Sequence, residues 1–213
     1  MTRPYSSFSR AQQAERARSR IVDAASRMLL SEGVAAMTIA GLAEEARVSP
    51  QTVYNTFGGK AEVVKAVYDV TLAGDEDPTP MSERPAFRAI QAAEDLPAFA
   101  VAYAHWVALI YSRVGALLGV LIAHGSAGDP LLEEFVTRIN GERRNGSANG
   151  IRPLAERGLV EEADLDTVID AVWALTAPEN WFRLVQQRGW SSERYEDWLA
   201  RVLDAALRMR GAA

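Results

Sequence analysis

Apolar residues recur at helical spacing near the start of the chain, so that one side of this segment is apolar. The residues at this spacing are Ile21, Ala24, Ala25, Met28 and Leu29. Gly33 follows, at the place where a left-handed glycine commonly closes a helix. We therefore predict a first helix over residues 10–32.

A second and shorter apolar stripe follows with the spacing i, i+3, i+4 and i+7. It is formed by Ile39, Leu42, Ala43 and Ala46. Thr38 directly precedes it, and a threonine oxygen in this position can accept a hydrogen bond from a free N–H at the start of a helix. The pattern predicts a second helix of about two turns with Thr38 as its N-cap.

The stretch "VSPQTVYNTFGGK", residues 48–60, predicts a third short helix. Ser49 is a suitable N-cap, and Pro50 occupies the first helical position, where a missing N–H costs nothing. Val53 and Phe57 form an i, i+4 pair that can face the two earlier helices. The opposite face is polar, and it carries Gln51, Thr52, Asn55 and Thr56. A helix this short must be held by its neighbours, as is the second helix of a helix-turn-helix in the DNA major groove.

The rest of the chain is also predicted to be helical. Gly58 and Gly59 end the third helix, and Lys60 opens a fourth. An acidic, Pro-rich connection at residues 74–85 leads to four longer helical patterns, and no strand alternation or internal repeat is visible. We predict an all-α fold, with an N-terminal arm and helix-turn-helix domain at residues 1–59 and a larger helical domain at residues 60–213.

Composition narrows the function classes. The 213 residues are 48% hydrophobic, which is enough for one domain with a real core or for two small ones. Residues 1–60 carry 8 Lys+Arg against 5 Asp+Glu, whereas the remainder carries 15 against 23, so the N-terminal end suits a polyanion better. With no cysteine and only two histidines, a metal site or a nucleophile–base pair is hard to build. We expect no cofactor and no catalytic activity.

One apolar run, residues 96–112, approaches the length of a membrane span. It contains His105 and ends at Arg113, and glycines follow at positions 115 and 119. We interpret this region as buried core helix and expect no membrane partner. The N-terminus has basic residues but no apolar segment behind them, so we expect a cytoplasmic protein.

The N-terminal residues resemble the TetR family of transcriptional regulators. The resemblance is clearest in "RIVDAASRMLLSEGVAAMTIAGLAEEARVSPQTVYNTFGGKAEVVKAVYD", which begins at residue 20. It is carried by the alanine-rich first helix, the Thr38-led second helix, the Val53–Tyr54 pair, Phe57 and Lys60. The resemblance implies a DNA-binding unit followed by a helical domain that binds a small ligand and dimerises. Residues 177–199 look like the last two helices of such regulators, which implies a homodimer through those helices.

Two positions depart from the family pattern. Gln51 stands where the family often has glycine, and Thr56 stands where histidine or tyrosine is favoured. Gln51 brings a side chain that can hydrogen-bond a base edge. DNA binding is still expected, but the operator sequence of a relative cannot be transferred to this chain.

The DNA contacts are expected to divide into two groups. We assign phosphate contacts to Thr38, Tyr54, Thr56 and Lys60, because helix N-termini and cations attract phosphates. We assign base contacts to Gln51, Thr52 and Asn55, since their amides and methyl can match base edges. Ser49 and Thr38 are expected to act as helix caps at the same time. The early arginines, Arg3, Arg10, Arg16, Arg18 and Arg20, are either a solvated face or a minor-groove arm.

The ligand candidates lie on two predicted helices of the larger domain, where aromatic residues alternate with a few polar ones. They are Tyr103, Trp106, Ile110, Arg113, Leu117, His124, Trp173, Asn180 and Trp181, the last two near a kink expected at Pro178. This mixture suits a pocket for a small, largely apolar molecule, although each residue is also an ordinary core residue.

Three functions follow from these patterns. The first is a repressor that binds a near-palindromic double-stranded DNA operator as a homodimer and is released by a small molecule. The second is a constitutive DNA-binding or interaction protein whose interior is merely core. The third is an enzyme using the helical cavity, for which Glu133, Glu134 and Glu179 are the available carboxylates.

Overall fold

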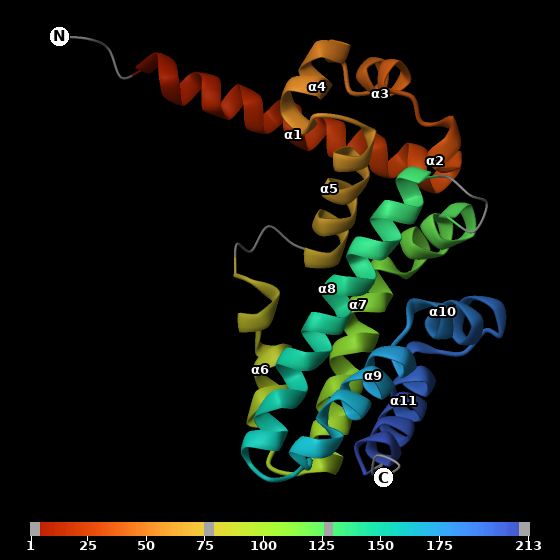
Figure 1. The fold of residues 1–213 in the computed structure, drawn as a ribbon. Helices are drawn as coiled ribbons and strands as arrows, with labels where there is room; N and C mark the ends of the chain where they lie inside the picture. Colours follow the sequence, from red (N-terminus) through yellow and green to blue (C-terminus); the bar gives the residue numbers. More distant parts are fainter. Residues whose placement is uncertain (1–4, 75–78, 126–129, 209–213) are drawn as a thin grey trace. The chain divides into compact units, whose positions relative to one another are not determined.

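The computed structural model describes residues 5–74, 79–125 and 130–208, without the side chains of residues 5–10, 123–125, 130 and 131, and its regular elements are all helical (Figure 1). The main helices are α1 (Tyr5–Ser31), α2 (Gly33–Ala36), α3 (Ile39–Glu45), α4 (Pro50–Phe57), α5 (Lys60–Ala73), α6 (Pro85–Ala92), α7 (Leu96–Gly125), α8 (Pro130–Glu156), α9 (Leu165–Leu175), α10 (Pro178–Trp181) and α11 (Ser192–Leu207). Short 3-10 turns occupy Met81–Glu83 and Glu162–Asp164, and a π-helical segment occupies Phe182–Gln187. The all-α prediction is confirmed.

The chain divides into two compact units. The first unit comprises Met1–Leu72 and Ala116–Val136, and the second comprises Ala73–Gly115 and Thr137–Ala213. The boundary between Gly115 and Ala116 falls inside α7, and the boundary between Val136 and Thr137 falls inside α8. Each of these long helices therefore contributes one end to each unit. The functional boundary expected between residues 59 and 60 stays a prediction.

The first unit has a core built from the predicted apolar stripes. Its buried residues include Ile21, Ala24, Ala25 and Leu29 of α1, Leu42 and Ala43 of α3, Val53 and Phe57 of α4, and Val63, Val64 and Val67 of α5. Gly33 has a φ of 81°, as expected for a left-handed residue after a helix. Helix α1 begins at Tyr5, earlier than predicted. The three predicted N-terminal helices are therefore present with the expected buried faces.

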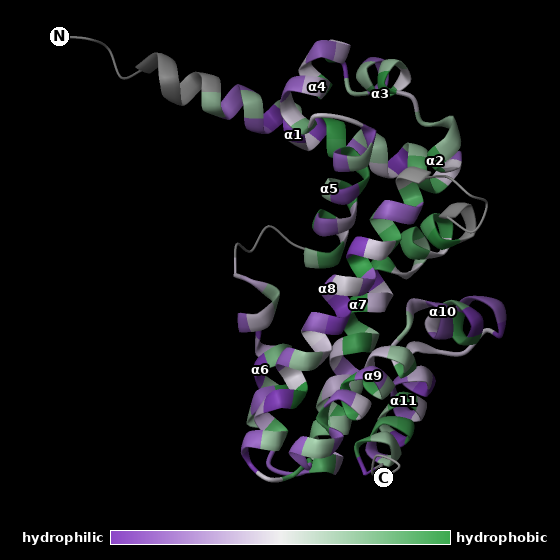
Figure 2. Ribbon diagram, viewed as in Figure 1, coloured by the Kyte–Doolittle hydropathy of each residue, from purple (hydrophilic) through white to green (hydrophobic). Residues whose placement is uncertain are grey.

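The second unit contains α6, α9, α10, α11 and the adjoining parts of α7 and α8. Its core includes Ile90, Phe99, Tyr103, Ile151, Leu154, Val172, Leu199 and Leu203. The apolar run at residues 96–112 belongs to one continuous helix, α7, whose apolar residues are spread along its length (Figure 2). By length and composition alone, Leu96–Ile122 is a candidate membrane span, and 56% of its most apolar window is buried inside the protein.

The segment around Pro178 differs from the expected kinked helix. Helix α9 ends at Leu175, and Pro178 takes the first turn of the separate helix α10. A proline is tolerated there because the N–H that it lacks would have had no partner in the helix. The chain then continues as the π-helical segment before Ser191 caps α11, its Oγ accepting from Arg194 N at 3.1 Å.

Candidate DNA-binding and ligand-binding sites

Thr38 forms the cap that the sequence predicts. Its Oγ1 accepts a hydrogen bond from Gly41 N at 3.1 Å, and its backbone is extended. The cap fixes the start of α3 and leaves Thr38 exposed. An exposed helix start presents free N–H groups, which is a suitable arrangement for a phosphate contact.

Ser49 caps α4. Its Oγ accepts from Thr52 N at 3.1 Å and lies 2.8 Å from Thr52 Oγ1, while Pro50 occupies the first turn. Thr56 Oγ1 donates to Thr52 O at 2.7 Å, so this hydroxyl is bonded to its own helix. The two threonines are therefore half-buried and held in place by local hydrogen bonds.

Helix α4 has a buried face and an exposed face. Val53 is fully buried and Phe57 is buried, whereas Tyr54 is 50% exposed. Gln51 and Asn55 are exposed one turn apart, and Gln51 Nε2 donates to Asn55 Oδ1 at 2.8 Å. The predicted base-contacting amides thus lie side by side on the outer face, opposite the side that anchors the helix.

Arginines of α1 support this helix-turn-helix. The Arg18 guanidinium lies 4.8 Å from the centre of the Phe57 ring, a cation–π contact with the end of α4. Arg27 Nη2 makes an ion pair with Glu45 Oε1 of α3 at 2.9 Å. Arg18 is therefore a support for α4 as well as a candidate for the arm, while the side chain of Arg10 and all of Arg3 lie outside the described residues.

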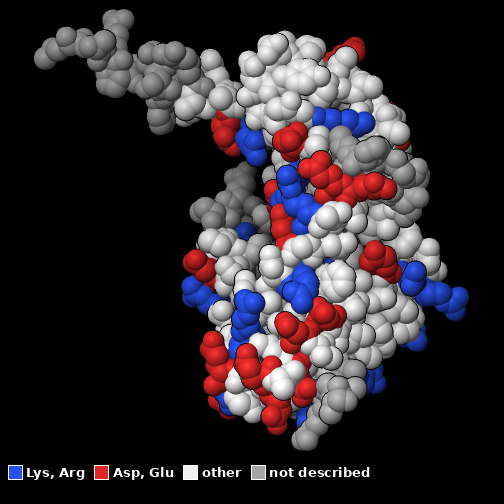
Figure 3. Space-filling model, in the orientation of Figure 1, with Lys and Arg blue, Asp and Glu red and all other residues white. Residues whose placement is uncertain are grey.

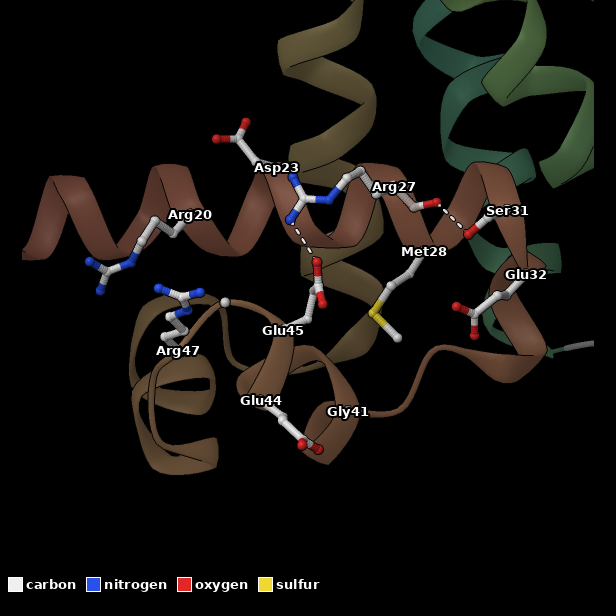
Figure 4. A pocket seen from close by; sticks show the side chains of 11 residues that line it. Arg20, Asp23, Arg27, Met28, Ser31, Glu32, Gly41, Glu44, Glu45 and Arg47 are labelled. Carbon is white, nitrogen blue, oxygen red and sulfur yellow. Dashed lines mark hydrogen bonds and ion pairs between the residues drawn. The ribbon is translucent and has the colours of Figure 1, made fainter.

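The turn between α3 and α4 contains a residue in an unusual backbone conformation. Arg47 has a φ of 55°, in the left-handed region that favours glycine. Its side chain and that of Arg20 extend toward each other beside a hollow of about 740 Å³ between α1 and α3 (Figure 4). The hollow is also lined by Asp23, Glu32, Glu44 and Glu45, so its charges are mixed.

Lys60 begins α5 directly after the glycine turn. Gly58 has a φ of 88° and ends α4, and Lys60 is half-buried at the start of the next helix. On the face shown in Figure 3, basic and acidic side chains are interspersed, so that face offers no extended basic surface.

Several predicted ligand residues are core residues with partners inside the second unit. Tyr103 is buried and its hydroxyl donates to Ser147 Oγ at 3.1 Å, while burial raises its pKa despite this bond and the nearby charge of Arg143. Trp106 is buried against Phe87, with ring centres 5.6 Å apart. Ile110 is half-buried.

Arg113 caps the end of α5. Its Nη1 donates to Ala73 O at 2.6 Å, and Arg84 Nη1 donates to the same oxygen at 3.0 Å. Leu117 is buried and belongs to the first unit. The side chain of His124 lies outside the described residues, and His105 lies on the surface, where its Nδ1 is 3.0 Å from Glu196 Oε1 of α11.

The remaining candidates surround the break between α9 and α10. Asn180 Nδ2 donates to Leu175 O at 2.9 Å and to Ala174 O at 3.3 Å, and so caps the end of α9. Trp181 is buried between the rings of Tyr111 and Tyr195, at 5.9 and 4.9 Å. Trp173 is half-buried overall, but its Nε1 is buried without a hydrogen-bond partner among the described residues.

Sequence reasoning missed a polar cluster in this unit. Arg143 Nη2 donates to Thr176 O at 2.7 Å and to Trp173 O at 3.0 Å, and the Tyr111 hydroxyl donates to the same Thr176 O at 2.5 Å. Burial raises the pKa of Tyr111 to about 12, against the lowering effect of Arg143. Arg143 stands in the polar run "NGERRNGSANG", which is typical of a solvated helix face, so only the three-dimensional contacts identify it.

These observations define a helix-turn-helix protein with a separate helical unit. Residues 21–67 match the family described as bacterial regulatory proteins, tetR family. A relative, the uncharacterized HTH-type transcriptional regulator YdeS of Bacillus subtilis (strain 168), is 29% identical over 154 residues, which is 72% of each protein. The family match is confined to the helix-turn-helix part, and over most of its length the chain is similar to an HTH-type transcriptional regulator.

Solved structures support the fold over almost the whole chain. A TetR-family regulator from Syntrophomonas wolfei str. Goettingen has a TM-score of 0.72 at 10% identity, over 93% of this chain and 99% of that one. A TetR regulator from Haloarcula marismortui ATCC 43049 has a TM-score of 0.59 at 15% identity, over 90% and 96%. The SmeT–triclosan complex has a TM-score of 0.61 at 18% identity, over 92% and 96%. At these identities the likeness concerns the fold alone.

Proposed function

We propose that the protein is a repressor that binds a near-palindromic operator as a homodimer and is released by a small molecule. The observation that carries the DNA-binding part is the exposed polar face of α4, with Gln51 and Asn55 outward and Val53 and Phe57 buried behind them. A helix anchored on one side and polar on the other is suited to the major groove. We place the protein in the cytoplasm, where its operator lies.

The roles of individual residues follow from their positions. Thr38, Tyr54, Thr56 and Lys60 contact phosphates and fix the register, while Ser49 holds the start of α4. Gln51, Thr52 and Asn55 read base edges, and each good pair contributes roughly 1–3 kcal/mol of discrimination. Residues 1–59 form the DNA-binding domain, and residues 60–213 bind the ligand and dimerise through the last two long helical segments.

A ligand can release the protein from its operator only if the ligand binds two conformations of the protein with different affinities. SmeT, which shares the fold, forms a complex with triclosan, and this supports a ligand site in the helical part. We assign that role to the interior of the second unit around Trp173, Asn180 and Trp181. A coupling of about 1–3 kcal/mol between ligand and operator is typical and would be enough to change operator occupancy.

Selection of genomic DNA fragments at two salt concentrations tests the proposal. Wild type is expected to recover a near-palindrome whose affinity falls with salt, since phosphate contacts release counterions. The Tyr54→Ala, Lys60→Ala double variant is expected to lose this binding. The control is a Leu30→Ala, Arg208→Ala variant, which changes one exposed apolar residue and one cation outside the proposed face. No recovered sequence, or equal loss in both variants, would reject the proposal.

A further inference from the structure

The Arg143 guanidinium forms no ion pair with a carboxylate among the described residues. Within the described residues, its hydrogen-bond partners are neutral oxygens: Trp173 O, the carbonyl and hydroxyl of Thr176, and Asn140 Oδ1. The carbonyls at the end of α9 carry only about half a negative charge in total. They cap the guanidinium without forming an ion pair with it, although the charge of Glu179 also acts on the Tyr111 hydroxyl of this cluster.

Tyr195 packs against Trp181, which also contacts Tyr111 of this cluster. The side chain is fully buried, and its oxygen has no hydrogen-bond partner among the described residues. Burial raises its pKa, the Tyr111 hydroxyl raises it further, and the charge of Arg143 opposes both. A buried hydroxyl without a partner costs free energy, and such groups in native proteins need an explanation.

Two aromatic rings pack against the ring of Tyr195. Trp181 lies edge-on at 4.9 Å between ring centres, and Trp198 lies at 5.6 Å. Trp181 is also followed directly by the π-helical segment Phe182–Gln187. Single π-helical turns inside helices are rare and often occur at functional sites.

We propose that the effector of this regulator is an aromatic acid whose carboxylate binds between the Arg143 guanidinium and the Tyr195 hydroxyl. The ring of the acid packs against Trp181 and Trp198, where the apolar surface lies. This inference rests on the proposed function, because it assigns the ligand class of the same unit. Since Tyr195 is fully buried, the acid reaches it by displacing Trp181 and the π-helical segment beside it.

Thermal unfolding of the full chain with benzoate and salicylate, each compared with its neutral amide, tests the ligand class. The acids are expected to raise the melting temperature by mass action, and the amides are expected to have little effect. The Tyr195→Phe variant is expected to weaken binding of the acids at least tenfold. Without ligand it is expected to melt at the wild-type temperature or above, because the removed hydroxyl had no partner.

Tyr68→Phe is the matched control. It makes the same chemical change at a buried tyrosine of the first unit, outside the cluster, so it is expected to leave binding of the acids unchanged. Arg143→Lys keeps the charge and is expected to preserve the preference for acid over amide, even where the altered cap on α9 reduces stability. Equal effects of acids and amides, no effect of either, or unchanged acid binding in Tyr195→Phe would overturn the inference.

Operator binding separates this inference from the proposed function. A protein that selects an operator but does not respond to aromatic acids remains a regulator, and the ligand class alone is rejected. A protein that binds the acids through Tyr195 but selects no operator retains the ligand class and loses the proposed function.

Discussion

Gln51 and Asn55 are hydrogen-bonded to each other on the exposed face of α4, with Gln51 Nε2 donating to Asn55 Oδ1 across 2.8 Å. The bond does not use the Gln51 carbonyl oxygen or the Asn55 amino group, so both can bond other partners. The two amides are therefore arranged before DNA arrives, and each fixes the orientation of the other.

This pair is expected to act as one unit in base recognition. In a double-mutant cycle on the selected operator, Gln51→Ala and Asn55→Ala should be non-additive, with an interaction of roughly 0.5–3 kcal/mol. Fluorescence anisotropy of labelled operator gives the four affinities. A parallel cycle of Gln51→Ala with Leu30→Ala, which lies on α1, should be additive. Additive losses in the first cycle would show that the two residues read bases independently.

Arg47 is expected to carry a conformational cost in the turn before α4. Its φ of 55° is a left-handed conformation, which costs a non-glycine residue about 1–2 kcal/mol. Arg47→Gly should therefore be more stable than Arg47→Ala by about 1 kcal/mol. Both variants lose the same guanidinium, so their comparison isolates the backbone. Urea unfolding measures the difference, and equal stabilities would refute the argument.

Gly115 is expected to be intolerant of a side chain. A Cβ added there would lie 2.5 Å from Trp181 Nε1, closer than packed atoms allow. Gly115→Ala should destabilise the protein by about 1–3 kcal/mol, as overpacking does. Gly141 on α8 has no heavy atom within 4 Å of the corresponding position, so Gly141→Ala should stabilise the helix by about 0.5–1 kcal/mol. Chemical unfolding is expected to show a lower free energy of unfolding for Gly115→Ala and a higher one for Gly141→Ala than for wild type.

The buried tyrosines are expected to make stability fall in alkaline solution. The pKa of Tyr111 is raised from 10.0 to about 12, so above pH 10 the unfolded chain loses this proton while the folded protein keeps it. The free energy of unfolding should therefore be unaffected below pH 10 and fall between pH 10 and 12, by up to about 1.4 kcal/mol per pH unit for each such group. Tyr111→Phe should make the fall less steep. Urea unfolding at several pH values measures it, and an unchanged slope in the variant would contradict the assignment.

Local signals made the first unit predictable. Thr38, Ser49 and Pro50 act on backbone groups within three residues, so their roles can be read from the sequence, and the structure has the caps at these positions. The side-chain bond between Gln51 and Asn55 also follows from helical spacing, although the sequence does not say which amide donates.

Distant contacts made the second unit harder to predict. Arg113 has the spacing of a pocket residue, yet its guanidinium bonds the carbonyl of Ala73, 40 positions away. Arg143 reaches Thr176 over 33 positions and stands in a stretch that looks solvated. Such roles depend on which helix ends lie next to each other in the folded protein, and the periodic pattern of apolar residues does not predict this.

The cap that Asn180 places on α9 has a consequence for any movement of Trp181. One amide nitrogen on α10 bonds the carbonyls of both Ala174 and Leu175, so a shift of α10 would break the two bonds together. Leu175 O would then need a new partner, whereas Ala174 O would keep the bond that it accepts from Ala177 N at 3.1 Å, and intermediate positions of α10 would leave Leu175 O the least satisfied. A displacement of Trp181 should therefore have a threshold, so that the segment occupies one of two positions and does not drift gradually between them.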